Sequence, residues 1–256
     1  MQPSDAVYPS LADQPVFITG GASGIGAAMV RHFAAQRSRV AFVDIQREAG
    51  AALAEEIAAL GQPKPLFLPC DLHDIAALRA AVAQAAGELG NFTVLVNNAA
   101  HDDRHDWRKV TVEYWDERLA VNLRHQFFAI QAIAPLMIAA GRGSIINFGS
   151  VSWRVSTGGM PAYTTSKAGV EGLTRSFARD LGGHGIRVNC VIPGWIMTER
   201  QRALWVTPEA EKNTLAAQCL KQLLYPADLA RMVLWLAAED SRMCTAHTWH
   251  VDAGRG

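Results

Sequence analysis

The chain has 256 residues, half of them hydrophobic, and its 24 Lys and Arg residues balance its 24 Asp and Glu residues. This size and composition predict one α/β domain over residues 1–256, with an N-terminal extension at 1–12. The even charge argues against a nucleic-acid-binding or membrane-binding surface and favours a small, neutral substrate.

The four cysteines, Cys70, Cys190, Cys219 and Cys244, are far apart and form no CxxC pair. This spacing is not that of a disulfide framework or a zinc site, and it indicates a reducing compartment. The first eleven residues lack the basic and apolar regions of a signal peptide, and no apolar run approaches the roughly 20 residues of a membrane-spanning helix. We therefore expect a soluble, cytoplasmic protein.

From residue 15 onward, short β-rich runs alternate with longer Ala- and Leu-rich stretches, a pattern typical of βαβ units and a parallel sheet. The predicted strands, most of them apolar throughout, are Val16–Thr19, Arg39–Val43, Pro65–Leu68, Thr93–Val96, Ser144–Phe148, Arg187–Ile192 and Thr248–Val251. The clearest helices are Ile25–Gln36, Gln46–Leu60, Ile75–Glu88, Glu113–Ala139, Ala162–Leu181 and Ala227–Ala237. These elements predict a doubly wound Rossmann fold with strand order 3-2-1-4-5-6-7 and a site at the carboxyl ends of the strands.

A glycine-rich loop joins the first predicted strand to the first predicted helix. It reads Thr19-Gly20-Gly21-Ala22-Ser23-Gly24-Ile25-Gly26. Glycines at such a turn let the backbone approach a pyrophosphate at the helix N-terminus. A glycine-rich loop by itself is often a plain turn, but the flanking strand and helix make a dinucleotide site the favoured interpretation.

Asp44 ends the second predicted strand, about twenty residues past the glycines, where a carboxylate accepts hydrogen bonds from the adenosine ribose. The same charge repels a 2′-phosphate. Arg47 is a counter-argument for NADP, but it lies a helical turn beyond the strand end, and Gly21 puts no basic side chain in the loop. The cofactor is therefore predicted to be NAD rather than NADP.

Both strand-end carboxylates have a structural alternative. Asp44 could also be the N-cap of the next helix. Asp71 and Leu72 follow the third strand, where they could hold the adenine amino group, or Asp71 could instead cap the helix that begins near His73.

Tyr163 and Lys167 stand four residues apart at the start of a helix, so their side chains project from the same face. A free tyrosine has a pKa near ~10, but a lysine ammonium and a positively charged nicotinamide would both favour its phenolate. Tyr163 is thus a candidate general base. Ser150 follows the fifth strand at the same edge of the sheet, where its hydroxyl could bond the substrate oxygen.

Taken together, these motifs resemble those of the classical short-chain dehydrogenases/reductases. The matching segments are Thr19-Gly20-x-x-x-Gly24-x-Gly26, Asn97-Asn98-Ala99-Ala100, Asn122, Ser150, Tyr163-x-x-x-Lys167, and Pro193-Gly194 followed by Thr198. They occur in the family's order over nearly the whole chain, and their joint spacing is highly specific. One departure is Ala100, where the family usually has glycine; a methyl group there strains the turn only if φ is positive.

The resemblance implies a role for each residue of the site. Ser150 would position the reacting hydroxyl and Tyr163 would take its proton. Lys167 would lower the tyrosine pKa and hold the nicotinamide ribose, and Asn122 would support a water relay behind the lysine. The residues expected to contact NAD are Gly20, Ser23, Gly24, Ile25, Gly26, Asp44, Asp71, Leu72, Asn98, Ala99, Tyr163, Lys167, Pro193, Gly194, Ile196 and Thr198.

Segments 97–105, 114–118, 122–125, 150–153 and 216–221 resemble a narrower group, the bacterial aldose 1-dehydrogenases of the D-xylose and L-arabinose type. This similarity implies NAD-dependent oxidation of a sugar such as L-arabinose, D-xylose or D-galactose at its anomeric carbon. Sugar sites combine aromatic faces with hydrogen-bonding groups in loops. The candidate contacts are His105, Ser150, Ser152, Trp153, Tyr163, Trp195 and Gln201. For Trp153 and Trp195, a place in the core or an interface is the commoner role.

Residues 101–106 form a loop dense in His and Asp side chains, which raises the question of a metal site. These residues are nearly contiguous, no cysteine joins them, and hydride transfer needs no Lewis acid. We therefore expect no metal and interpret the loop as a hydrogen-bonded flank of the active site.

Two rival hypotheses stay open. The same catalytic residues could act on another alcohol or ketone, such as a sugar acid or a 3-oxoacyl substrate, with NADP; Asp44 argues against that cofactor. The chain could instead be an inactive dinucleotide sensor, against which the intact set Asn122, Ser150, Tyr163 and Lys167 argues.

The predicted helices Glu113–Ala139 and Ala162–Leu181 are long and carry apolar residues on more than one face. Such helices predict a homo-oligomer, and the family resemblance implies a tetramer.

Overall fold

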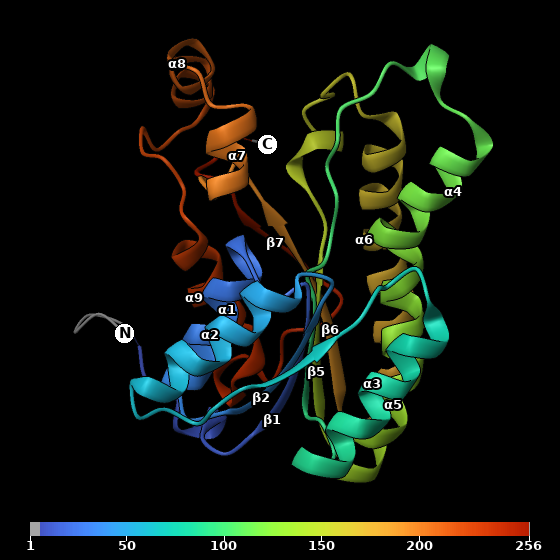
Figure 1. The fold of residues 1–256 in the computed structure, drawn as a ribbon, viewed down its shortest axis with the longest axis vertical. Coiled ribbons are helices and arrows are strands. Elements are labelled where there is room, and N and C mark those ends of the chain that lie inside the picture. The colour runs from blue at the N-terminus through green and yellow to red at the C-terminus, as the bar shows by residue number, and fades with distance from the viewer. Residues whose placement is uncertain (1–5, 256) are drawn as a thin grey trace.

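A seven-stranded parallel sheet with helices on both faces forms the centre of the computed structural model, which describes residues 6–255 (Figure 1). The strands are β1 (Pro15–Thr19), β2 (Arg39–Asp44), β3 (Leu66–Pro69), β4 (Val94–Asn97), β5 (Gly143–Phe148), β6 (Ile186–Pro193) and β7 (Thr248–Val251). Their order is β3-β2-β1-β4-β5-β6-β7, and every neighbouring pair is parallel. The predicted fold class and strand order are confirmed.

Two groups of helices cover the sheet. On one face lie α1 (Gly24–Ala35), α2 (Arg47–Ala59) and α9 (Pro226–Ala237), and on the other lie α3 (Ile75–Leu89), α5 (His125–Ala140) and α6 (Pro161–Leu181) (Figure 1). Successive strand side chains point to opposite faces, so Val16 and Ile18 join the core beneath α1 and α9, whereas Phe17 joins the core beneath α3 and α5. Both faces of the sheet are therefore buried, which explains why the strands are apolar throughout.

The predicted N-terminal extension is packed onto the fold where the structure describes it. Leu11 is buried in the core, and the Gln36 side chain donates to Ala6 O and accepts from Tyr8 N. Residues 1–5 lie outside the described part of the chain. Among residues 6–255, no helix combines the length and apolar character needed to cross a lipid bilayer.

The long helix predicted at Glu113–Ala139 is interrupted. It consists of α4 (Val112–Leu119), a π-helical turn at Ala120–Arg124, and α5. The reason lies in Asn122, whose side-chain amide donates to the Arg118 carbonyl at 2.9 Å and so takes an acceptor that a regular helix offers to the backbone. Wider turns of this kind occur frequently at functional sites.

Two short helices between β6 and β7, α7 (Glu199–Leu204) and α8 (Pro208–Ala217), were not predicted. Each begins at a threonine whose hydroxyl accepts from a backbone amide of the first turn, Thr198 for α7 and Thr207 for α8. Neither has the apolar periodicity of a core helix, and α7 buries no residue at all. They stand at one end of the sheet (Figure 1).

Candidate active site

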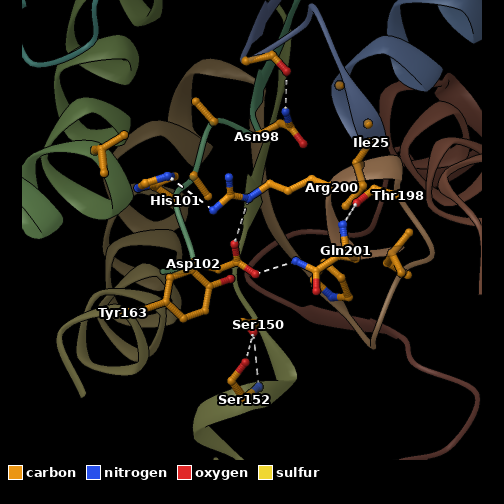
Figure 2. Close-up of a pocket in the computed structure, with 18 of the residues that line it drawn as sticks. Ile25, Asn98, His101, Asp102, Ser150, Ser152, Tyr163, Thr198, Arg200 and Gln201 are labelled. Carbon is orange, nitrogen blue, oxygen red and sulfur yellow. Dashed lines mark hydrogen bonds and ion pairs between the residues drawn. The ribbon is translucent and has the colours of Figure 1, made fainter. Parts of the chain in front are cut away.

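A cavity of about 1100 Å³ lies at the carboxyl ends of the strands, where the fold predicts a site (Figure 2). The predicted cofactor contacts that line it are Gly20, Ser23, Gly24, Ile25, Gly26, Asp44, Asp71, Leu72, Asn98, Ala99, Tyr163, Pro193, Gly194, Ile196 and Thr198. Of the predicted substrate contacts, Ser150, Ser152, Trp195 and Gln201 also line it. One space therefore joins the two sets of residues.

The glycine loop at the cofactor end leaves no room for a Cβ at Gly20 or Gly26. Gly20 has a φ of +69°, and a Cβ built there would lie 2.8 Å from Ala99 Cα. A Cβ on Gly26 would lie 1.8 Å from the Gly20 carbonyl oxygen. These close approaches bring the N-terminus of α1 against the strand ends, as binding of a dinucleotide requires.

The first turn of α1 keeps its backbone amides available. The N-cap residue Ser23 makes no side-chain capping bond; its hydroxyl instead accepts from the Gln46 side chain at 3.0 Å. Uncapped amides and the positive end of the helix dipole together favour an anion such as a pyrophosphate. The residues of this loop thus fit a dinucleotide.

Asn98 fixes the glycine loop from the neighbouring strand. Its side-chain amide donates to the carbonyl oxygens of Thr19 and Gly20 at 3.0 and 2.8 Å. Thr19 Oγ1 accepts in return from the backbone amides of Asn98 and Ala99. Ala100, the departure from the family pattern, is not among the residues with positive φ, so its methyl group causes no backbone strain.

Asp44 is a buried carboxylate that braces the loop. One oxygen accepts from Ala22 N at 2.9 Å and the other from Gln46 N at 3.0 Å. The N-cap of α2 is Gln46, so the alternative role of Asp44 as N-cap is wrong. The carboxylate still lines the cavity at the end of β2, where the adenosine ribose is expected.

Asp71 and Leu72 line the cavity after β3. Asp71 accepts from the backbone amide of His73 at 3.0 Å and lies 2.7 Å from its ring nitrogen Nδ1, and these bonds lower the pKa of Asp71. Because the N-cap of α3 is Asp74, the alternative role of Asp71 as a helix cap is wrong. The adenine role stays a prediction.

The segment after β6 closes over the glycine loop. A Cβ built on Gly24 would lie 3.3 Å from Thr198 Cγ2, so this segment touches the loop directly. A Cβ on Gly194 would lie 2.8 Å from Asp252 Cα, which explains the glycine at this position. The segment lies where the resemblance implies that it covers the nicotinamide.

Tyr163 and Ser150 form the centre of the site (Figure 2). Tyr163 enters from the first turn of α6 and lines the cavity together with Ser150. Ser150 Oγ lies 2.7 Å from Ser152 Oγ and accepts from Ser152 N at 3.1 Å. Burial raises the pKa of Tyr163 above its ordinary value, and the nearby Ser150 hydroxyl offsets this only in part.

Lys167 is buried beneath Tyr163. Its Nζ donates to the Phe148 carbonyl oxygen at 2.8 Å and lies 5.8 Å from the centroid of the tyrosine ring. Burial lowers the pKa of Lys167 to about 8. In this geometry the pKa of Tyr163 is raised rather than lowered, which differs from the effect that the resemblance implies for the lysine.

Asn122 does not line the cavity but holds a loop that does. Its Oδ1 accepts from His101 N at 2.9 Å, and its Nδ2 donates to His101 O at 3.1 Å as well as to Arg118 O. Its own carbonyl accepts from Gln126 Nε2 at 3.3 Å. Both polar ends are therefore engaged by the protein, and the water relay stays a prediction.

Two predicted sugar contacts, His105 and Trp153, are not among the described residues that line the cavity. His105 Nδ1 is 2.9 Å from the Tyr114 hydroxyl, and these two rings pack together. Trp153 donates from Nε1 to Glu171 at 3.1 Å, and Arg154 lies over its ring. Both side chains therefore have protein partners, and their role as sugar contacts stays a prediction.

The wall of the substrate end is a polar network that includes Asp102 and Arg200, which were not predicted as site residues (Figure 2). Gln201 Nε2 donates to Asp102 Oδ2 at 2.6 Å, and Gln201 Oε1 accepts from Trp195 Nε1 at 2.8 Å. Arg200 Nη2 donates to Asp103 Oδ1 at 2.6 Å. Residues 101–106 are thus hydrogen-bonded at the edge of the cavity, and within residues 6–255 no three His, Cys, Asp or Glu side chains are grouped as a metal site.

Comparison with known proteins agrees with this site. Residues 20–255 match the family model described as "Enoyl-(Acyl carrier protein) reductase". The chain therefore belongs to the short-chain dehydrogenase/reductase family, and the resemblance seen in the sequence is confirmed. It is an oxidoreductase that acts on a CH–OH group, in a family that uses NAD(P).

Two curated relatives span almost the whole chain. A D-xylose 1-dehydrogenase of Caulobacter vibrioides is 49% identical over 98% of this chain and 99% of its own length. A probable galactose dehydrogenase of Rhizobium meliloti is 49% identical over 96% of each chain. Among solved structures, a blue fluorescent protein from a metagenomic library in complex with NADPH has a TM-score of 0.87 and is 35% identical, over 96% of this chain and 99% of its own.

Proposed function

We propose that this protein oxidises an aldose at its anomeric carbon to the aldonolactone, with NAD as the hydride acceptor. The observation that carries the proposal is that Tyr163 and Ser150 share one cavity with the polar wall of Asp102 and Gln201. The first pair suits deprotonation of a hydroxyl, and the second suits recognition of further hydroxyls. The sugar dehydrogenases among the relatives support this substrate class.

The reaction breaks two bonds of the sugar and forms one. Ser150 and Tyr163 hold the anomeric oxygen, and Tyr163 accepts the proton of the anomeric hydroxyl as its O–H bond breaks. The hydride leaves the anomeric carbon with the electron pair of its C–H bond, and a C=O bond forms, which gives the lactone. When bound, oxidised NAD accepts this hydride and adds a positive charge to the site.

Tyr163 must lose its proton before it can act as a base. Burial raises the pKa of this tyrosine, so the phenolate needs stabilisation by neighbouring positive charge. Lys167 lies below the ring and is fixed by Phe148 O, which leaves protons on its ammonium group for other acceptors. We propose that this ammonium group and the bound cofactor together favour the phenolate.

The polar wall of Asp102 and Gln201 is suited to binding a neutral sugar. The Asp102 carboxylate accepts hydrogen bonds from hydroxyl groups, and the Gln201 amide both donates and accepts. Trp195 adds an aromatic ring to the same wall, and its Nε1 is held by Gln201. We propose Asp102 as the main acceptor for the sugar hydroxyls.

The proposed preference for NAD over NADP rests on Asp44. Its carboxylate at the end of β2 suits ribose hydroxyls and repels a 2′-phosphate, and Gly21 brings no basic group to the loop. Against this stands one similar structure that binds NADPH. Steady-state rates with the two cofactors test the preference, and faster turnover with NADP contradicts it.

We further propose that the chain is one cofactor-binding and catalytic domain that assembles as a homotetramer in the cytoplasm. Phe127 and Ile138 of α5 are 40% and 41% exposed, which supports burial of this helix against another copy. The four cysteines are free thiols, as in a reducing compartment. Light scattering tests the assembly, and a monomer contradicts it.

The experiment that tests the function follows NADH absorbance with a panel of substrates. The aldoses are L-arabinose, D-xylose, D-galactose and L-fucose, and a sugar acid and a 3-hydroxyacyl thioester represent the rival substrate classes. We expect turnover with at least one aldose and its loss in Ser150→Ala. If none of the aldoses reacts while another class does, the sugar proposal is wrong and the membership of the family stands.

A further inference from the structure

Helix α7 carries Arg200 and Gln201 of the polar wall at the substrate end, yet none of its own residues is buried. It is six residues long, whereas α9 buries five residues among the main core. The core anchors only the chain before α7, through the buried Ile196 and Met197. Since a helix without buried apolar side chains gains little from hydrophobic packing, the placement of α7 itself depends on polar contacts.

Those contacts converge on the loop after β4. Arg200 of α7 donates to Asp103 Oδ1 at 2.6 Å. Its Nε also lies 3.5 Å from Asp102 Oδ1 (Figure 2). One guanidinium group thus faces two neighbouring carboxylates. Just beyond α7, the Trp205 ring lies beneath the Arg104 guanidinium, 4.5 Å from the centroid. Both ends of the helix are tied to the same loop.

The loop itself is held by the buried part of the fold. Asn122, which is fully buried, binds the amide and the carbonyl of His101. On the far side of the loop, Arg118 is 5% exposed and contacts the His101 ring, with a guanidinium nitrogen 3.8 Å from Asp103 Oδ2. The core therefore fixes the position of the loop, and the loop in turn fixes the position of α7.

We propose that Arg200 and Asp103 form a charged latch, which fixes α7 and thereby aligns Asp102 and Gln201 toward the substrate. Asp103 does not line the cavity, so it acts as a positioning residue rather than as a substrate contact. The proposal rests on the sugar-binding role proposed above for Asp102. Because the Arg200 and Asp103 side chains are 45% and 44% exposed, the latch is partly screened by salt.

The test compares the steady-state kinetics of Asp103→Asn, Arg200→Gln and the double variant Arg200→Gln/Asp103→Asn. Arg202→Gln is the matched control, since Arg202 lies on the same helix, points to Tyr225 and does not line the cavity. Pairs as exposed as this one have modest energies, so we expect the KM of the aldose to rise about three- to fivefold in each single variant. The KM of NAD should stay within about twofold, and the double variant should be little worse than either single variant, because all three lose the same interaction.

Ionic strength and hydrogen exchange give two further readouts. Added salt should raise the aldose KM of the wild type toward that of Arg200→Gln, and should leave the variant nearly unchanged. Amide hydrogens of residues 199–204 should exchange faster in Asp103→Asn than in the wild type or in Arg202→Gln. This second readout needs no substrate, so it separates failure of the latch from failure of the proposed function.

Unchanged exchange at residues 199–204 in both single variants contradicts the latch whatever the enzyme oxidises. An equal rise in the KM of NAD, or a double variant whose loss is the product of the two single losses, contradicts its positioning role. If α7 exchanges faster as expected but the wild type oxidises no aldose, the latch stands and the assignment of a sugar to this wall is wrong.

Discussion

The two ends of the cavity are built by different means. At the cofactor end, Gly20 and Gly26 bring backbone against backbone with no space for a Cβ, and Asn98 binds the loop from β4. At the substrate end, half-exposed charged side chains join a loop to a helix that buries nothing. The dinucleotide end is therefore fixed by main-chain geometry, whereas the substrate end depends on side chains that can change without disturbing the fold.

Removal of the Tyr163 hydroxyl should have the largest effect, because this group lies where the two ends meet. General base catalysis typically contributes about 10²- to 10⁴-fold, so Tyr163→Phe should reduce kcat by a factor in that range. NADH binding, followed by its fluorescence, should persist. Tyr225→Phe, at an exposed tyrosine, is the control, and an unchanged rate of NADH formation in Tyr163→Phe would show the mechanism to be wrong.

A methyl group at Gly26 tests the close backbone packing at the cofactor end. The added Cβ would overlap the Gly20 carbonyl oxygen at 1.8 Å, and overpacking of this kind costs about 1–3 kcal/mol or more. We expect Gly26→Ala to lower the free energy of unfolding and to weaken NADH binding. Gly172→Ala is the matched control, because the helical Gly172 has open space around its Cβ position and should gain about 0.5–1 kcal/mol. Equal stability of the two variants contradicts the account.

Acid should lower the free energy of unfolding through His125, the buried first residue of α5. Burial is the main cause that lowers the pKa of this histidine to about 3, from an ordinary value of 6.5. The unfolded chain therefore binds a proton between these two pH values and the folded chain does not, so stability falls as the pH falls through this window. At pH 5 the loss from His125 alone should be about 2 kcal/mol relative to pH 7.

Urea unfolding of His125→Gln at pH 7 and pH 5 measures this loss. The variant should be about 2 kcal/mol less sensitive to the change of pH than the wild type. His184→Gln, at an exposed histidine, is the control and should behave as the wild type does. If His125→Gln lost as much unfolding free energy between pH 7 and pH 5 as the wild type does, another group would cause the acid sensitivity.

Asp44→Asn removes a negative charge at the cofactor end and should have a smaller effect than the preceding variants. An amide oxygen at this position can still accept from Ala22 N, while the charge that opposes a 2′-phosphate is removed. The ratio of kcat/KM for NAD to that for NADP should fall about tenfold, the equivalent of ~1.4 kcal/mol. Asp74→Asn, at the cap of α3, should leave the ratio unchanged. An unchanged ratio in Asp44→Asn contradicts the role of the charge.

The strand order and the glycine loop could be predicted from the sequence because local patterns encode them. Apolar runs, a glycine spacing and the four-residue step from Tyr163 to Lys167 each lie within one turn or one strand. The interruption at Asn122 could not be predicted, because it depends on where the Asn122 side chain bonds. Its amide takes the Arg118 carbonyl while the same side chain also binds His101, twenty-one residues away.

The substrate end was predicted less well for the same reason. Gln201 and Asp102 are 99 residues apart, and no spacing rule joins them. Trp153 and His105 bond to Glu171 and Tyr114 and do not line the cavity, and no sequence pattern predicts these partners. Short helices such as α7 also lack an apolar stripe, so they cannot be predicted from apolar periodicity.

The most direct test of the proposed function follows the hydrogen on the anomeric carbon. The enzyme is given NAD and either D-xylose or D-galactose with deuterium at C1, and the reduced cofactor and the sugar product are analysed by mass spectrometry and NMR. We expect one deuterium in the reduced cofactor and an unlabelled aldonolactone. Reduced cofactor without deuterium, together with a product that keeps its label at C1, would contradict oxidation at the anomeric carbon.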